Sequence, residues 1–142
     1  MQSREYLKQA YKLNEKIKDK QERLLSMKEL SDCIGATDYS KDKVQTSPKG
    51  DAPFVNQVTK IIELEEELQQ DLLQMFQLKA EISKAIDAVE DVNCSLVLSK
   101  RYILMKTWEQ IAEDMNYSVS QIQRIHERAL EIFEVPQKDD MK

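Results

Sequence analysis

Glycine and proline are scarce in this chain, and so are cysteine, histidine and tryptophan. The 142 residues include 2 Gly, 3 Pro, 2 Cys, 1 His and 1 Trp, whereas charged residues make up 33% and hydrophobic residues 41%. So few helix-breaking residues in a highly charged chain favour long, solvated helices over a sheet protein. We therefore expect an all-α protein that forms one domain, or one small domain with an extension.

The scarcity of reactive side chains argues against most enzyme chemistry. Cys33 and Cys94 lie far apart in sequence, so they form no zinc-ligand spacing and indicate a reducing compartment rather than a disulfide scaffold. His126 lies close to the apolar side of its predicted helix, where a partly buried packing role is expected. The sequence also has no glycine-rich phosphate loop. We predict no enzymatic activity, catalytic residue, metal, cofactor or small-molecule substrate.

Long hydrophobic runs are absent as well. No run approaches the about 20 apolar residues that cross a bilayer, and the N-terminal stretch MQSREYLKQAYKL has no signal-peptide core. We expect a cytoplasmic protein with no membrane partner. The formal net charge of −5 argues against a binder that relies on electrostatics alone. The carboxylates of the ELEEEL run, Glu63, Glu66 and Glu67, are expected to be solvated helix surface.

Two long helices are predicted from apolar residues that recur at alternating spacings of four and three. The first runs from about residue 3 to 34 and the second from about residue 52 to 89. Gly35 is expected to end the first helix, and residues 35–53, which hold both glycines, to form a long mobile loop. Residues 1–92 would then form an antiparallel, coiled-coil-like helical hairpin.

The predicted hairpin buries little surface by itself. A homodimer through the long helices is therefore expected, because a second copy would cover the exposed apolar side chains. The alternative is an elongated monomer in which the C-terminal domain supplies the third packing partner.

Residues 93–134 are predicted to form a domain of three helices, followed by a disordered tail at 135–142. Asn93 is the expected N-cap of the first helix, which covers about residues 94–104. The second and third helices each begin with a capping box, in which a hydroxyl side chain and a Gln three residues later bond each other's backbone. These boxes are Thr107 with Gln110 and Ser118 with Gln121.

The short connection between the second and third helices predicts a helix-turn-helix. Ala112 is small where two helix backbones must approach, and Asn116 tolerates the left-handed conformation that ends a helix sharply. In such motifs the first turns of the last helix meet base edges, where Gln suits adenine and Arg suits guanine. The candidate base-reading residues are Ser120, Gln121, Arg124 and Arg128, and the candidate phosphate contacts are Lys100, Arg101 and Lys106.

The charge of this segment limits the DNA-binding hypothesis. Between residues 94 and 134 five bases face six acids, for a net charge of −1. Phosphate neutralisation supplies most non-specific affinity, so one copy is expected to bind DNA weakly. Useful affinity would require two copies or RNA polymerase as a co-partner. The exposed Gln and Arg side chains also have an ordinary interpretation as solvated helix surface.

The stretch RYILMKTWEQIAEDMNYSVSQIQRIHERAL resembles region four of bacterial sigma factors, over about residues 94–133. The whole chain resembles small phage-encoded or prophage-encoded proteins related to the ArpU and RinA transcriptional regulators; DYSKDKVQTSPKGD and IIELEEEL carry this likeness. The resemblance implies a sequence-specific transcriptional regulator of phage genes. The alternative is an adaptor that binds RNA polymerase or another phage protein without touching DNA.

The chain differs from the proteins that it resembles at two positions around the second helix of the C-terminal domain. Such proteins often have glycine near Met105 and at Asn116. Because a methionine does not easily take a left-handed backbone, the start of the second helix is expected to differ at Met105.

Overall fold

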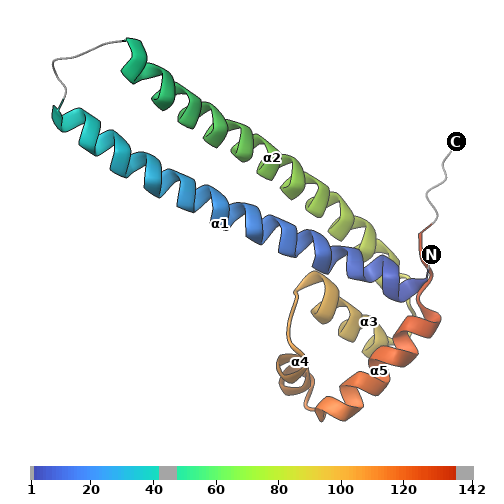
Figure 1. Cartoon of the computed structure of the whole chain (residues 1–142). Helices are drawn as coiled ribbons and strands as arrows, with labels where there is room; N and C mark the ends of the chain where they lie inside the picture. Colours follow the sequence, from blue (N-terminus) through green and yellow to red (C-terminus); the bar gives the residue numbers. More distant parts are fainter. Residues whose placement is uncertain (1, 42–47, 137–142) are drawn as a thin grey trace, which may run out of the picture. The chain divides into compact units, whose positions relative to one another are not determined.

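A computed structural model describes the fold of residues 2–41 and 48–136, all of whose regular structure is helical, which confirms the all-α prediction (Figure 1). None of the helices in these ranges is both long and apolar enough to cross a membrane. The elements are α1 (Ser3–Lys41), α2 (Pro48–Asp87), α3 (Val92–Leu98), the π-helical segment η2 (Ser99–Ile103), α4 (Trp108–Met115) and α5 (Val119–Ile132).

The chain divides into two compact units. Unit 1 is built from residues 1–14 and 74–142, and unit 2 from residues 15–73. Unit 1 thus combines the first turns of α1 and the last turns of α2 with the C-terminal helices. It takes in more of the chain than the segment 93–134 that the sequence alone suggests as a domain.

In unit 2, α1 and α2 run in opposite directions and are joined by ion pairs. The pairs are Lys16 with Asp71, Lys20 with Asp71 and Glu67, and Lys28 with Glu65, so positions rise along α1 as they fall along α2. Ile17, Leu64 and Leu68 are buried in this unit.

One ion pair of unit 2 lies in its interior. Lys20, which interrupts the apolar pattern of α1, is buried, and so is Asp71 of α2. The Lys20 Nζ lies 2.8 Å from the Asp71 Oδ2. Contact with Asp71 raises the pKa of Lys20 above its ordinary value. A buried charge is tolerated only with an opposite charge nearby, so this pair links one turn of α1 to one turn of α2.

Both long helices extend beyond their predicted ends. The prediction that Gly35 ends the first helix is wrong, since α1 continues to Lys41 and no glycine in the described ranges has a positive φ. Glycine inside a helix costs only about 1 kcal/mol relative to alanine, which is too little to stop it. α2 begins at Pro48, where a proline in the first turn loses no intrahelical bond. The predicted loop 35–53 is therefore too long at both ends, and its residues 42–47 lie outside the described ranges.

Unit 1 is organised around side chains that come from every one of its segments. Leu7 and Ala10 of α1, and Ile82 and Ile86 of α2, are fully or almost fully buried. The C-terminal helices contribute a cluster of four buried residues, Val97, Ile111, Ala112 and Ile122. The partly buried side chains packed against this cluster are Trp108, Met115, Tyr117, Val119 and Ile125.

The first C-terminal helix starts earlier than predicted. Asp91, not Asn93, is the N-cap of α3, because its carboxylate Oδ1 accepts a hydrogen bond from the Cys94 backbone N–H at 3.2 Å. A cap side chain reaches the amide two or three residues further along, and Asp91 has the required spacing to Cys94. Asn93 lies inside the helix, where its amide donates to the Tyr117 hydroxyl at 3.3 Å.

Candidate nucleic-acid interface

Both ends of α4 are fixed by local hydrogen bonds. Thr107 Oγ1 accepts from the Gln110 N–H at 3.1 Å, and Gln110 Oε1 accepts from the Thr107 N–H at 3.0 Å, which confirms the first capping box. At the other end, Asn116 has a left-handed backbone with φ 61°, as predicted. The chain therefore leaves α4 in one defined direction.

The N-cap of α5, Ser118, follows two residues after Asn116 and forms the second predicted capping box. Ser118 Oγ accepts from the Gln121 N–H at 3.1 Å, and Gln121 Oε1 accepts from the Ser118 N–H at 3.0 Å. Ala112 and Ile111 of α4 are buried together with Ile122 of α5. Capping and packing together fix the angle between these two short helices.

The start of α4 departs from the expectation at Met105. This residue does adopt a left-handed backbone, with φ 57°. The conformation is held by two hydrogen bonds of the next residue, because the Lys106 N–H donates to the Lys100 carbonyl at 2.9 Å and Arg101 Nη1 donates to the Lys106 carbonyl at 3.0 Å. These bonds offset a conformational cost of about 1–2 kcal/mol for a residue with a Cβ.

Substituting Met105→Gly is expected to raise the free energy of unfolding of unit 1 by about 1 kcal/mol, because glycine takes a positive φ without strain. The single tryptophan, Trp108, packs on the unit 1 core and provides a fluorescence signal for urea unfolding. Met115→Gly is the control: it places glycine in the right-handed backbone of α4 and should lower stability. A loss of stability in both variants would contradict the expected relief of strain.

The four predicted base-reading residues all lie on the exposed surface of α5, but they differ in the contacts that their side chains make within the chain. Ser120 and Arg124 are exposed, and Arg124 has no ion pair within the described residues. Arg128 Nη1 lies 3.8 Å from Asp91 Oδ2. Gln121 is exposed, but its Oε1 is already engaged in the capping box, so a two-bond contact with adenine would compete with the cap.

The three predicted phosphate contacts are engaged within the chain. Lys100 and Lys106 both pair with Asp114, and the hydrogen bond from Lys106 holds the pKa of that carboxyl below its ordinary value. The Arg101 guanidinium lies over the Trp108 ring, 4.0 Å from its centroid, and 5.1 Å from that of Tyr11. These are cation–π contacts, so Arg101 links η2 to α4 and to α1.

His126 is buried, which confirms its predicted packing role. Its Nε2 lies 2.7 Å from the Tyr102 hydroxyl, and the Trp108 ring meets it edge-on at 4.8 Å between centroids. Burial lowers the pKa of His126 to about 4, so the imidazole is neutral at neutral pH.

An ion pair between distant parts of the sequence lies on the α5 surface. Arg4 Nη2 donates to both carboxylate oxygens of Glu127, at 3.0 and 2.9 Å. This hydrogen bonding holds the pKa of Glu127 below its ordinary value. Sequence reasoning missed this pair, because the two residues are 123 positions apart and neither pattern nor spacing connects them.

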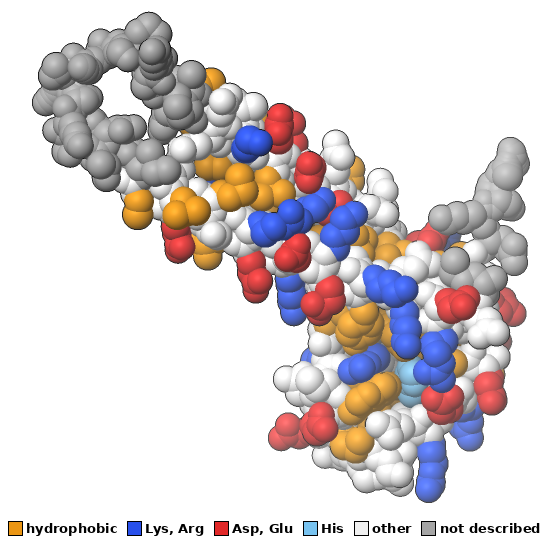
Figure 2. All heavy atoms as spheres, in the orientation of Figure 1, with side chains coloured by type: hydrophobic (Ala, Val, Ile, Leu, Met, Phe, Trp, Pro, Cys, Tyr) orange, Lys and Arg blue, Asp and Glu red, His pale blue; other side chains and the backbone are white. Residues whose placement is uncertain are grey.

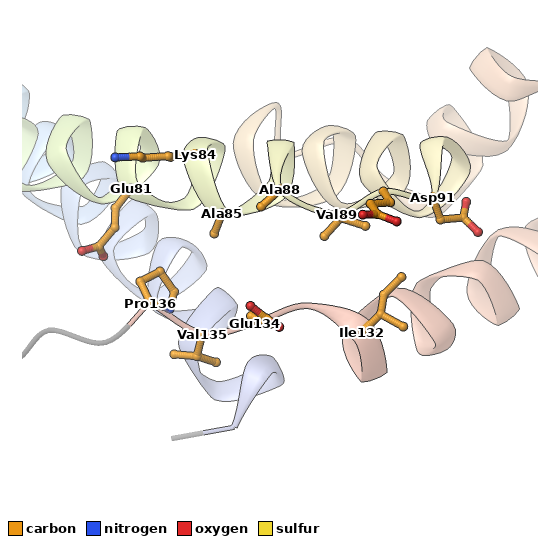
Figure 3. A pocket seen from close by; sticks show the side chains of 11 residues that line it. Glu81, Lys84, Ala85, Ala88, Val89, Asp91, Ile132, Glu134, Val135 and Pro136 are labelled. Carbon is orange, nitrogen blue, oxygen red and sulfur yellow. The ribbon is translucent and has the colours of Figure 1, made fainter.

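A groove of about 1020 Å³ opens between the end of α2 and the segment after α5 (Figure 3). Its apolar walls include Ala85 and Ala88 on the α2 side and Ile132 of α5 on the other side. Its charged lining residues are one lysine and four acids, namely Lys84, Glu81, Glu90, Asp91 and Glu134. An acidic rim repels phosphate, so the groove is not part of the candidate interface.

Comparison with known proteins identifies a family for this chain. A family model described as "Protein of unknown function (DUF1492)" matches residues 33–134, a range that contains all of α3, η2, α4 and α5. No curated protein matches the chain. No solved structure matches it.

Proposed function

Because the chain belongs to the DUF1492 family, whose description assigns no activity, we propose a function from the geometry of α4 and α5. We propose that these helices form a helix-turn-helix like that of sigma factor region four and place α5 in the major groove of DNA. The protein would act as a sequence-specific transcriptional regulator of phage or prophage genes, as a dimer or together with RNA polymerase.

The observation that carries this proposal is the fixed turn between two capped helices. The left-handed Asn116 and the Ser118 capping box set the direction of α5, and the buried Ala112 allows the helices to approach closely. A rigid, outward-facing helix start is what groove recognition requires, since base edges are read by side chains on the first turns.

Arg124 is the residue best placed to read a base. It is exposed on the second turn of α5 and has no ion pair in the described part of the chain, so its guanidinium can donate two hydrogen bonds to guanine. Ser120 lies one turn earlier and can donate or accept a single bond. Arg128 can exchange its 3.8 Å contact with Asp91 for a phosphate.

The contacts that the other basic side chains make within the chain favour a second candidate function. Lys100, Lys106 and Arg101 are engaged within the chain, which leaves few positive charges on the C-terminal helices for phosphates. An adaptor that binds RNA polymerase or another phage protein would need no such charges. The selection experiment below separates the two functions.

For α1 and α2 we propose a helical hairpin that serves as a dimerisation or polymerase-contacting arm. In unit 2 the α2 side chains Ile62, Leu72 and Leu73 remain 44–57% exposed, and a second copy would cover them. Sedimentation equilibrium of the purified chain tests the dimer, and a monomer at every concentration would exclude it.

The base-reading role is tested by selecting duplexes from a random pool with the full chain, then measuring affinity by fluorescence anisotropy. Arg124→Ala should weaken binding to the selected sequence by about 5- to 150-fold, because one bidentate contact is worth about 1–3 kcal/mol. Random DNA should be affected much less.

The matched control for this experiment is Arg23→Ala, which removes one exposed arginine from unit 2. It should leave the affinity for the selected sequence unchanged. Failure to enrich any sequence at low salt would contradict DNA reading and leave the adaptor.

A further inference from the structure

The DNA-binding hypothesis faces a shortage of positive charge on the C-terminal helices, and the structure places additional cations beside them. Unit 1 includes the first turns of α1, and side chains of these turns bond residues of the C-terminal segment. Ser3 Oγ donates to the Phe133 carbonyl at 3.1 Å, Arg4 bonds Glu127, and the Tyr11 hydroxyl donates to the Arg101 carbonyl. The N-terminal turns are therefore part of the same compact unit as α5.

These turns of α1 carry a row of basic side chains. Arg4, Lys8 and Lys12 are spaced four residues apart, so they follow one another along one side of the helix. All three are exposed, whereas Tyr6, Ala10 and Leu13 on the opposite side are buried. Neither lysine has an ion pair in the described part of the chain, in contrast to Lys100 and Lys106.

The basic row begins at the candidate DNA-reading surface. Arg4 contacts Glu127, which lies on α5 three positions after Arg124 and so within one helical turn of it. Figure 2 shows Lys and Arg side chains gathered on this face around the pale blue histidine, which is His126. Residues 2–14 carry three bases against one acid, Glu5, for a net charge of +2.

We propose that Arg4, Lys8 and Lys12 form a second DNA-contacting surface, the α1 basic row, in which Lys8 and Lys12 bind the phosphate backbone beside the groove occupied by α5 and Arg4 stays paired with Glu127. This inference rests on the proposed function. Lysine suits this role as a point charge that needs no fixed geometry, and each neutralised phosphate releases bound counterions. The row supplies the phosphate contacts that Lys100, Arg101 and Lys106 do not provide.

Arg4 has a separate task in this surface. Glu127 is a carboxylate in the middle of the exposed side of α5, where it would repel DNA. By bonding both of its oxygens, Arg4 neutralises that charge and holds the start of α1 against the reading helix.

The lysines are tested by comparing two variants with the same net charge. Lys8→Gln with Lys12→Gln removes two charges from the row, whereas Lys18→Gln with Lys60→Gln removes two exposed charges from unit 2. The dependence of log affinity on log salt is measured with a selected duplex and with a random duplex. The row variant should flatten the slope by about 2, at about 0.9 per phosphate contact, and weaken both duplexes alike. The control variant should keep the wild-type slope.

The outcomes separate this inference from the proposed function. A row variant with the wild-type slope, or a control with the same loss, would overturn the α1 basic row. If Arg124→Ala still lost affinity for the selected duplex, DNA reading by α5 would stand. Failure of the wild-type chain to bind any duplex at low salt would overturn both.

Arg4 is tested in the same assay with Arg4→Ala alone and combined with Glu127→Gln. The single change leaves an unpaired carboxylate facing DNA and should weaken binding; the double change removes that carboxylate and should restore part of the affinity. A double variant as weak as the single one would overturn the neutralising role of Arg4.

Discussion

The free energy of unfolding of unit 1 is expected to fall by about 3 kcal/mol as the pH is lowered from 6.5 to 4. Burial lowers the pKa of His126 to about 4, from an ordinary value of 6.5 in the unfolded chain. Between these values the unfolded state binds a proton that the folded state does not. The stability is therefore fully present above pH 6.5 and is lost as the pH falls, by about 1.4 kcal/mol per unit.

The surroundings of His126 explain why the folded state resists the proton. Its ring lies between Tyr102 and Trp108, which leaves the imidazolium little access to water. The nearby Glu127 carboxylate, 4.0 Å from Nδ1, opposes this shift, but that carboxylate is already bonded by Arg4. The lowered pKa values of Glu127 and Asp114 affect stability only below pH about 4.5, outside most of the histidine window.

The test is urea unfolding at several pH values between 7 and 4.5, followed by Trp108 fluorescence. His126→Gln is the matched variant, because the amide can still bond the Tyr102 hydroxyl but cannot titrate. Its stability should change little over this range. An equally flat profile for the wild-type chain would show that the imidazole accepts a proton in the folded state.

The second large effect is expected for Ile122→Ala, which should lower the free energy of unfolding of unit 1 by about 3–4 kcal/mol. Ile122 is fully buried and packs with Val97 of α3 and with Ile111 and Ala112 of α4. Removing three carbons from such a position leaves a cavity that fixed neighbours do not fill. Here the capping boxes hold α4 and α5 in place, so collapse around the gap is limited.

Ile62→Ala is the control, since it is the same substitution on the α2 surface of unit 2, where the side chain is 47% exposed. Its cost should stay below about 1 kcal/mol because little apolar area is lost from the interior. Both variants are compared by urea unfolding. Similar losses in the two would mean that the four-residue cluster is not the core of unit 1.

The sequence predicts the C-terminal helices well where structure is decided by neighbours within one turn. Thr107 with Gln110, Ser118 with Gln121, and the left-handed Asn116 all depend on contacts three or four residues apart, which spacing reveals. The errors also have local causes. Asp91, one turn before Cys94, caps α3 in place of Asn93. Hydrogen bonds of residues near Met105 hold that residue at a positive φ.

The candidate site was predicted less completely, because residues distant in sequence decide which of its side chains are paired within the chain. Spacing showed that Arg124 and Ser120 face outward, but not that Asp114 binds Lys100 and Lys106. It could not show that Arg4 reaches Glu127 or that Tyr11 lies against Arg101. Such contacts follow from the packing of α1 on the C-terminal helices, which no pattern within either segment encodes.

The hydrogen bond from Ser3 to Phe133 also bears on how the protein is made. It joins residues 130 positions apart, so unit 1 cannot close until its last helix has left the ribosome. At translation rates of about 5–20 residues per second, the N-terminal turns wait roughly 6–26 seconds for their partners. During that interval the Tyr6 ring lacks Phe133, on which it stacks, and a nascent chain that stalls before α5 would leave this part of the unit 1 core incomplete and open to chaperones.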